Sequence, residues 1–269
     1  MRGIMLRGMA VGVTETVPGV SGSTVAIVLG VYEELIYNLS LMTTKKRREA
    51  YPFLFIFGIG MVLGFILSLF LIDYFLTNFK TQTLSFFMGI VVGFIPFLWK
   101  ETVSLSRRKL SLRNYIIILV FFSVVVFGQL FGGFGAMNVE QLTTLDYVFL
   151  IVAGFIASTA LVLPGISGAL ILTIFGIYEL AKDSLLALHM PVVLSIGSGV
   201  VLGVLLSSKF IRILLKKHPV ETYSAMLGLV VGSIFAILAN MDPLASSAGL
   251  IMTTLTFLLG GLGSVFLQR

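Results

Sequence analysis

Two short segments of the chain carry the same pattern, in which Pro-Gly is followed by serine and glycine. They read TVPGVSGSTV at 16–25 and VLPGISGALI at 162–171. Proline followed by glycine stops a helix, and a helix that starts again at about Ser21 or Ser167 has free backbone N–H groups. These groups, together with nearby hydroxyls, can donate hydrogen bonds to an anion such as phosphate or carboxylate. The two segments therefore predict a pair of anion-binding helix breaks.

The candidate ligands for the anion follow each Pro-Gly, and one arginine precedes the first. The breaks are placed at Pro18, Gly19, Pro164 and Gly165. The expected donors are Ser21, Gly22, Ser23, Thr24, Ser167 and Gly168, with Arg7 for the phosphate charge, because guanidinium binds phosphate in a bidentate manner. Two alternatives stay open. The serines could only cap the helices, and Arg7 could simply be a residue that sets membrane topology.

Glu15 is an ionisable residue in an otherwise apolar stretch, three residues before Pro18. Its counterpart in the second segment is Leu161, so the architecture does not require a carboxyl group there. A buried carboxyl can hold a proton near neutral pH, so Glu15 could carry a coupling proton, or it could pair with a cation. The alternatives are that it pairs with Arg7 or caps backbone groups.

The elements that hold these residues must be membrane helices. Of 269 residues, 58% are hydrophobic and 11% are charged, whereas a soluble domain would carry about 25% charged residues. Apolar runs predict six membrane-spanning helices, at 52–76, 82–99, 114–132, 191–209, 221–239 and 248–267. The 28 glycines and 7 prolines favour close-packed, broken helices over a β-barrel. The expected fold is an all-α polytopic membrane protein.

The composition also argues against several classes of function. The chain has no cysteine, which excludes disulfides, thiolate nucleophiles and cysteine-bearing zinc or iron–sulfur sites, and no metal or other cofactor is expected. It has no Gly-x-Ser-x-Gly elbow, Walker loop or His-Glu-x-x-His motif, which argues against an enzyme. The net charge of +6 is explained by membrane topology, so no nucleic-acid partner is expected.

Two stretches that contain the Pro-Gly motifs, at about 9–36 and 147–181, are each too short for two complete spans. Re-entrant hairpins are predicted for both, because this arrangement places 16 of the 18 basic residues and both termini on the inside, with Lys80 and Lys182 outside. Tyr32 and Tyr178, at the mouths of the hairpins, are expected to be interfacial anchors.

The second half of the chain repeats the first. The alignments are 18–35 with 164–181 at an offset of 146, and 60–64 with 199–203 and 88–93 with 227–232 at an offset of 139. The repeats at 1–132 and 147–269 each hold one hairpin and three helices, and an odd number of crossings inverts the second copy. The sequence therefore predicts an inverted-topology repeat within one integral membrane domain, as in secondary transporters. Gly-x-x-x-Gly pairs in both copies predict close helix packing.

In both copies, Pro-Gly-[Val/Ile]-Ser-Gly is followed, eight residues after its second glycine, by Gly-[Val/Ile]-Tyr-Glu. With these motifs the chain resembles the PopT-type polyprenyl-phosphate translocase family, long catalogued as a domain of unknown function. The most specific part runs from Arg7 to Leu35, RGMAVGVTETVPGVSGSTVAIVLGVYEEL. The family usually has Ser-Gly-Gly-Thr in this hairpin, and Ser23 stands here in place of the second glycine. The resemblance spans essentially the whole chain.

The resemblance implies that the protein returns undecaprenyl phosphate, the lipid carrier of cell-wall precursors, to the inner leaflet of the bacterial cytoplasmic membrane. The two halves would alternate access to a mid-membrane phosphate site, and Glu15 would serve proton linkage or gating. The coupling ion, proton or sodium, and the oligomeric state stay open. Two other functions also stay open: a carrier or channel for a small soluble anion, and a membrane scaffold with no transport cycle.

Overall fold

The computed structural model describes residues 2–15, 17, 20–106, 109–131, 142–165, 167–243 and 247–267, and every regular element in these ranges is a helix. The helices are α1 (Arg2–Thr14), α2 (Gly22–Val28), α3 (Tyr32–Leu41), α4 (Arg47–Asn78), α5 (Lys80–Ser106), α6 (Leu112–Phe131), α7 (Thr144–Val162), α8 (Gly168–Ile174), α9 (Tyr178–Leu186), α10 (Met190–Lys217), α11 (Pro219–Ala239) and α12 (Ser247–Leu267). The predicted all-helical class is confirmed.

Six of the described helices are long and apolar enough to cross a membrane: α4, α5, α6, α10, α11 and α12. They coincide with the six predicted spans, so the protein is a multi-pass membrane protein. α4 begins earlier than predicted, at Arg47, and α10 ends later than predicted, at Lys217. Lysine and arginine are good helix formers, so the charged flanks continue the helices beyond the apolar stretch.

Each Pro-Gly stretch folds as three helices, where the prediction expected a simple hairpin. α2 and α8 begin directly after Ser21 and Ser167, as predicted. α2 then turns into α3 through Gly30, at φ +64°, and Gly176, at φ +70°, occupies the same place between α8 and α9. Glycine takes such angles without strain, which lets α3 bend away from α2 by 119°.

The packing of the first half is repeated in the second. α1 packs on α4 as α7 packs on α10, and α5 packs on α12 as α11 packs on α6. Glycines in these interfaces lie against backbone carbonyls of the partner helix: Gly60 on Met5, Gly199 on Ile151, Gly89 on Phe257 and Gly228 on Ile118. A side chain at any of them would collide with that backbone. The predicted packing role of the Gly-x-x-x-Gly pairs is confirmed.

The last helix of each half packs against the other half. α6 lies on α11, and α12 lies on α5, while α5 and α11 also contact each other. The largest fully buried side chains include Leu84 and Phe94 of α5 and Leu227 and Ile237 of α11. The core therefore sits where the two halves meet.

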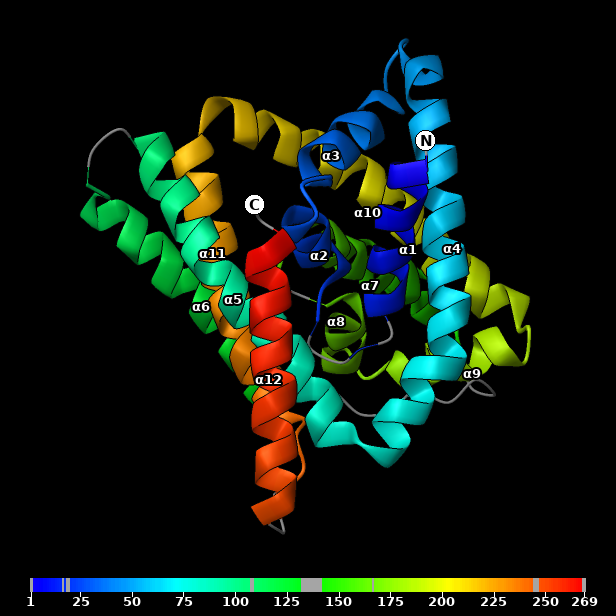
Figure 1. The fold of residues 1–269 in the computed structure, drawn as a ribbon. Helices are drawn as coiled ribbons and strands as arrows, with labels where there is room; N and C mark the ends of the chain where they lie inside the picture. Colours follow the sequence, from blue (N-terminus) through cyan, green and yellow to red (C-terminus); the bar gives the residue numbers. More distant parts are fainter. Residues whose placement is uncertain are drawn as a thin grey trace.

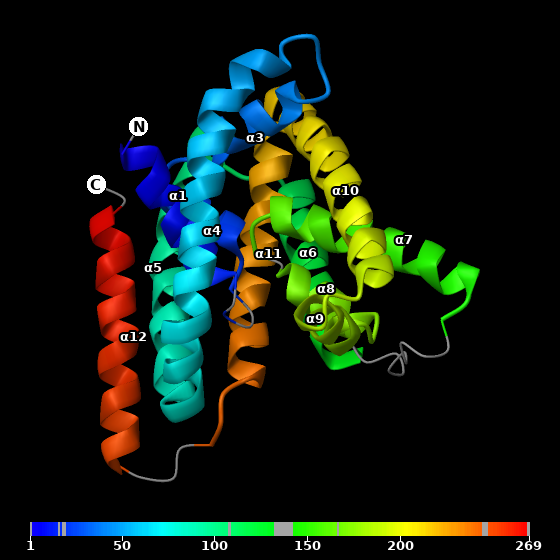
Figure 2. The same ribbon diagram turned by 90° about the vertical axis from the view of Figure 1, so that its right-hand side faces the viewer.

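α3 and α9 lie at opposite ends of the bundle (Figure 1, Figure 2). α3 is held where α10 ends and α11 begins: Arg212 Nη1 donates to Ser40 Oγ at 2.9 Å, and its guanidinium lies 4.3 Å from the centroid of the Tyr37 ring. Tyr223 Oη donates to Glu33 Oε1 at 2.9 Å. α9 instead lies near the start of α10, to which it is joined through residues 187–189.

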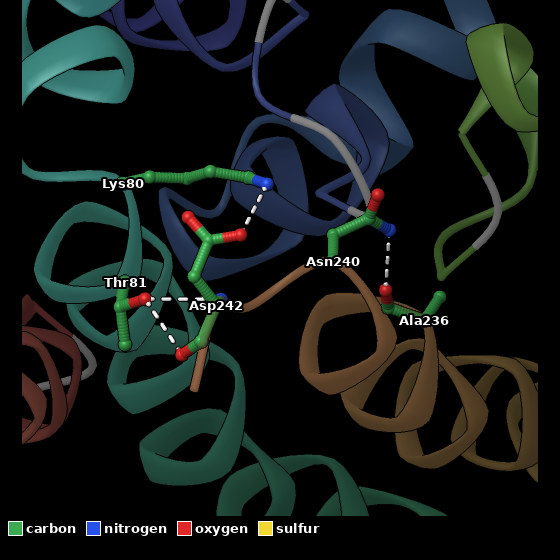
Figure 3. Close-up of polar contacts among 5 residues, drawn as sticks. All are labelled: Lys80, Thr81, Ala236, Asn240 and Asp242. Atoms are coloured by element: carbon green, nitrogen blue, oxygen red, sulfur yellow. Dashed lines mark hydrogen bonds and ion pairs between the residues drawn. The ribbon is translucent and has the colours of Figure 1, made fainter. Parts of the chain in front are cut away.

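At the end of the bundle opposite α3, the start of α5 is tied to the segment after α11 (Figure 3). Lys80 Nζ lies 2.9 Å from Asp242 Oδ1. Thr81 Oγ1 donates to the Asp242 carbonyl and accepts the Asp242 N–H, both at 3.1 Å. Asn240 Nδ2 donates to the Ala236 carbonyl at 2.8 Å, which satisfies one of the last carbonyls of α11.

Candidate functional site

The two Pro-Gly breaks, 146 residues apart in the sequence, are in direct contact. The Gly165 N–H donates to Thr24 Oγ1 at 2.9 Å, and Tyr32 Oη donates to the Val162 carbonyl at 2.9 Å. Thr24, Tyr32 and Val162 are each less than 5% exposed. The carbonyl of Val162 belongs to the last turn of α7, which has no helical partner, so Tyr32 supplies the missing donor.

The buried position of Tyr32 contradicts a prediction. It was expected to be an interfacial anchor, but it is 4% exposed and lies between the two halves. Its counterpart Tyr178 is 38% exposed, as an interfacial residue would be. The repeat gives both residues the same sequence signal, so only the packing of α3 on the second half could separate them.

The first break carries four of the predicted donors, Ser21, Gly22, Ser23 and Thr24. Ser21 Oγ and Ser23 Oγ lie 2.7 Å apart, and both residues are buried. Ser21 does not cap α2 with its side chain. Instead the carboxylate of Glu15 accepts a hydrogen bond from the Gly22 N–H, and Glu15 Oε1 occupies the space that a side chain at position 22 would need.

This arrangement distinguishes between the two alternatives for Glu15, an ion pair with Arg7 and the capping of backbone groups. The carboxylate caps a backbone group, as that alternative proposed, and it has no ion pair with Arg7 in the part of the chain that the structure describes. Arg7 is exposed on α1, eight residues before Glu15, which is about 12 Å along a helix. In this conformation the structure does not bring Arg7 to the predicted donors.

The second break is shaped by Gly165. Its φ is +92°, and a side chain would collide with the backbone of Leu229 and Val230 in α11. Pro164, Ser167 and Gly168 are buried beside it. Thr24 therefore joins the first break to the second through the Gly165 N–H. Pro18 and Gly19 of the first break lie outside the described residues.

A cavity of about 280 Å³ opens beside the first break. It lies among α1, α3, α4, α7 and α10, and its polar side chains are Glu15, Ser23 and Tyr32. The remaining walls are apolar and include Leu35 and Phe57. Arg7, Ser167 and Gly168 do not line it. The cavity can hold a polar group near Glu15 and Ser23 and an apolar group between α3 and α4.

Metal chemistry finds no support in the described residues, because no three His, Asp or Glu side chains are grouped to hold an ion. Sequence reasoning missed the contact of Glu15 with Gly22, the role of Tyr32 and the apolar walls of the cavity. The only sequence signal for the first was the lone carboxyl group in an apolar stretch. The apolar walls come from five different helices, and a linear pattern does not place them together.

Six candidate spanning helices among the described residues, with an amphipathic cavity beside a helix break, are typical of a membrane transporter. The chain belongs to the VCA0040-like family, described as undecaprenyl phosphate translocase-like, which matches residues 11–249. The predicted family is confirmed.

Two curated relatives are named polyprenyl-phosphate transporter. The protein of Staphylococcus aureus is 31% identical over 250 residues, covering 88% of this chain and 86% of the relative. The protein of Vibrio cholerae is 27% identical over 246 residues, covering 85% of this chain and 75% of the relative. No solved structure matches the chain.

Proposed function

We propose that this protein translocates polyprenyl phosphate, such as undecaprenyl phosphate, and that it acts as a transporter and not as an enzyme. The names of its family and relatives support this substrate. The observation that carries the proposal is the cavity beside the first break, because its single polar end and apolar walls match a lipid with a phosphate headgroup. A pathway with polar walls would suit a soluble anion better than this cavity does.

The phosphate would be held by the buried hydroxyls of the first break. The hydroxyls of Ser21 and Ser23 are hydrogen-bonded to each other, and either can turn toward an anion. Gly22 and Thr24 from the first break, with Ser167 and Gly168 from the second, complete the proposed set. Arg7 stays a candidate for the phosphate charge, and its exposed position would let it meet a headgroup before the headgroup enters the cavity.

We also propose that the two halves are an inverted repeat that alternates access to this site. The equivalent helix pairs and the placement of α3 and α9 at opposite ends support it. The contact between Arg212 and Ser40 puts the ends of α3 and α10 at the same end of the bundle, as two re-entrant stretches require. The proposed setting is the cytoplasmic membrane of a bacterium, with both termini in the cytoplasm.

Glu15 is proposed to link a proton to the phosphate. A carboxylate and a phosphate in one apolar cavity repel each other strongly, since Coulomb energy grows as the dielectric constant falls. A proton on Glu15 would remove that repulsion and would also weaken the hydrogen bond that the Gly22 N–H donates to it. Tyr32 is the other titratable group on this cavity, and it already donates its proton to the Val162 carbonyl.

The test of the substrate is binding of a short-chain polyprenyl phosphate to the protein in lipid nanodiscs. Wild type is compared with Ser21→Ala, Ser23→Ala and Arg7→Ala, with inorganic phosphate as competitor. We expect tight binding that weakens in the variants and is little affected by inorganic phosphate. Recognition of inorganic phosphate without lipid binding would indicate a soluble-anion carrier. Intact function in all three variants would indicate a scaffold.

The test of proton linkage is the rate of lipid translocation across a range of pH. We expect the wild-type rate to change with pH and the rate of Glu15→Gln to be insensitive to it, because the amide cannot titrate. A wild-type rate that is constant across the range would remove the proposed role of Glu15.

A further inference from the structure

Two larger cavities lie at opposite ends of the bundle. One, of about 510 Å³, lies among α6, α7, α10 and α11, and we call it the charged cavity; the other, of about 460 Å³, lies among α4, α5 and α12, and we call it the neutral cavity. Most residues that line the neutral cavity have a counterpart in the charged cavity. Ile211 and Ile72, Thr222 and Thr83, and Thr256 and Ile117 are each 139 positions apart.

The two cavities share a shape but differ in charge. The charged cavity is lined by Arg113, His218 and Glu221. The neutral cavity has Met252, Phe79 and Gln82 at the positions 139 residues away. Because the same offset relates every one of these pairs, the cavity itself belongs to the repeated scaffold. The charged residues line only one of the two equivalent cavities.

The charged cavity is amphipathic. Arg113 and Glu221 lie at its exposed end, where Arg113 Nη1 is 3.4 Å from Glu221 Oε1 and the arginine side chain is 71% exposed. Exposed His218 lines the cavity with them, and exposed Lys216 and Lys217 directly precede it in the chain. Arg113 and these two lysines outnumber Glu221, the one carboxylate among the lining residues. This excess suits an anion.

The rest of the charged cavity is mainly apolar, with Thr159, Ser207 and Thr222 as its other polar lining residues. Ile211, which is 2% exposed, and Leu214 line its wall, and so does Leu163, next to the second Pro-Gly break. Phe210 also lines it and is 61% exposed, next to Lys209 near the end of α10. An apolar chain in this cavity can therefore leave it along the exposed side chain of Phe210.

We propose that the charged cavity is a second binding site for a lipid phosphate monoester, distinct from the cavity beside Glu15 and Ser23. The phosphate is held at Arg113 and His218, and the chain lies along Ile211, Leu214 and Phe210. The neutral cavity accepts an apolar chain but has no charged lining residue to hold the phosphate. The inference rests on the proposed function for the identity of the lipid, and it adds a site at one end of the bundle that receives or releases it.

The repeat suggests which substitutions to use in the test. Arg113→Met and His218→Phe install the residues that the equivalent positions 252 and 79 already hold, and Glu221→Gln installs the residue of position 82. Binding is measured in nanodiscs with a short-chain polyprenyl phosphate that carries a photoreactive group, and labelled peptides are mapped by mass spectrometry. Met252→Leu in the neutral cavity is the matched control.

We expect labelling of peptides from α6, α10 and α11 in the wild type. Arg113→Met should weaken this labelling about tenfold, the effect of losing one charge-assisted hydrogen bond. His218→Phe should weaken it less, Glu221→Gln should strengthen it because a nearby negative charge is removed, and Met252→Leu should leave it unchanged. Opposite responses to Arg113→Met and Glu221→Gln cannot come from misfolding, which would lower labelling in both.

Labelling at the Glu15 and Ser23 cavity but not in α6, α10 or α11 would overturn this inference and leave the proposed function standing. Equal responses to Arg113→Met and Met252→Leu would also overturn it. Absence of labelling in every part of the protein would overturn the proposed function together with it.

Discussion

At the scale of single residues, Thr24 connects the two helix breaks through one hydrogen bond to the Gly165 N–H. We expect Thr24→Val to lower the free energy of unfolding by about 1–3 kcal/mol, because it leaves a buried N–H without an acceptor. The measurement is the thermal unfolding midpoint in detergent. Thr24→Ser keeps the hydroxyl and should retain most of the stability, so equal losses in both variants would contradict this role of the bond.

Gly165 is expected to be the glycine least tolerant of substitution in the site. Gly165→Ala combines a positive φ with a collision against the backbone of Leu229 and Val230, which together should lower the free energy of unfolding by roughly 3 kcal/mol or more. Gly197→Ala in α10 meets no atom within 4 Å and is the control. A similar unfolding midpoint for the two variants would show that the close approach of Gly165 to α11 is absent.

The sequence predicts the positions of the site residues better than it predicts their contacts. Ser21 and Ser167 were placed correctly at the restarts of α2 and α8, because proline and glycine act on the local backbone. The bond between Glu15 and Gly22, and that between Thr24 and Gly165, depend on how separate segments pack. A pattern along one chain does not contain that packing.

At the scale of the helices, the contact of Tyr32 with Val162 holds α3 against the end of α7. We expect Tyr32→Phe to lower the free energy of unfolding by about 1 kcal/mol, the net value of one hydrogen bond, and to alter the translocation rate, because the bond joins the two halves. Tyr178→Phe at the equivalent, exposed position should change neither. Identical behaviour of the two variants would argue against a special role for Tyr32.

The long helices could be predicted from the sequence, but the helices on which they pack could not. α4, α5, α6, α10, α11 and α12 follow from apolar runs that end in charged flanks, a signal that the membrane makes strong. The predicted hairpins ended at residues 36 and 181, inside α3 and α9, since each of these helices is short and no charge separates it from the preceding helix. The exchange of α6 and α12 between the halves has no signature in either sequence, because glycine pairs indicate that a helix packs closely but not on which partner.

At the scale of the whole molecule, the proposed inverted topology can be tested by labelling single cysteines, since the natural chain has none. In right-side-out vesicles, we expect Lys182→Cys to react with an impermeant maleimide, and Lys45→Cys and Lys216→Cys to react only after permeabilisation. All three positions are exposed. Reaction of Lys45→Cys and Lys216→Cys from opposite sides would mean that the second Pro-Gly stretch crosses the membrane once, which contradicts the re-entrant arrangement.

The packing of α12 on α5 also sets an order of events during biosynthesis. Ser106 at the end of α5 precedes Ser247 at the start of α12 by 141 residues, so α5 enters the membrane long before its partner has been translated. Until then the glycine face of α5 at Gly89 and Gly93 faces lipid or a temporary partner. A ribosome that stalls before α12 would leave a nascent chain whose central helix is inserted but uncovered, which is the kind of surface that membrane quality-control proteases meet in unfinished proteins.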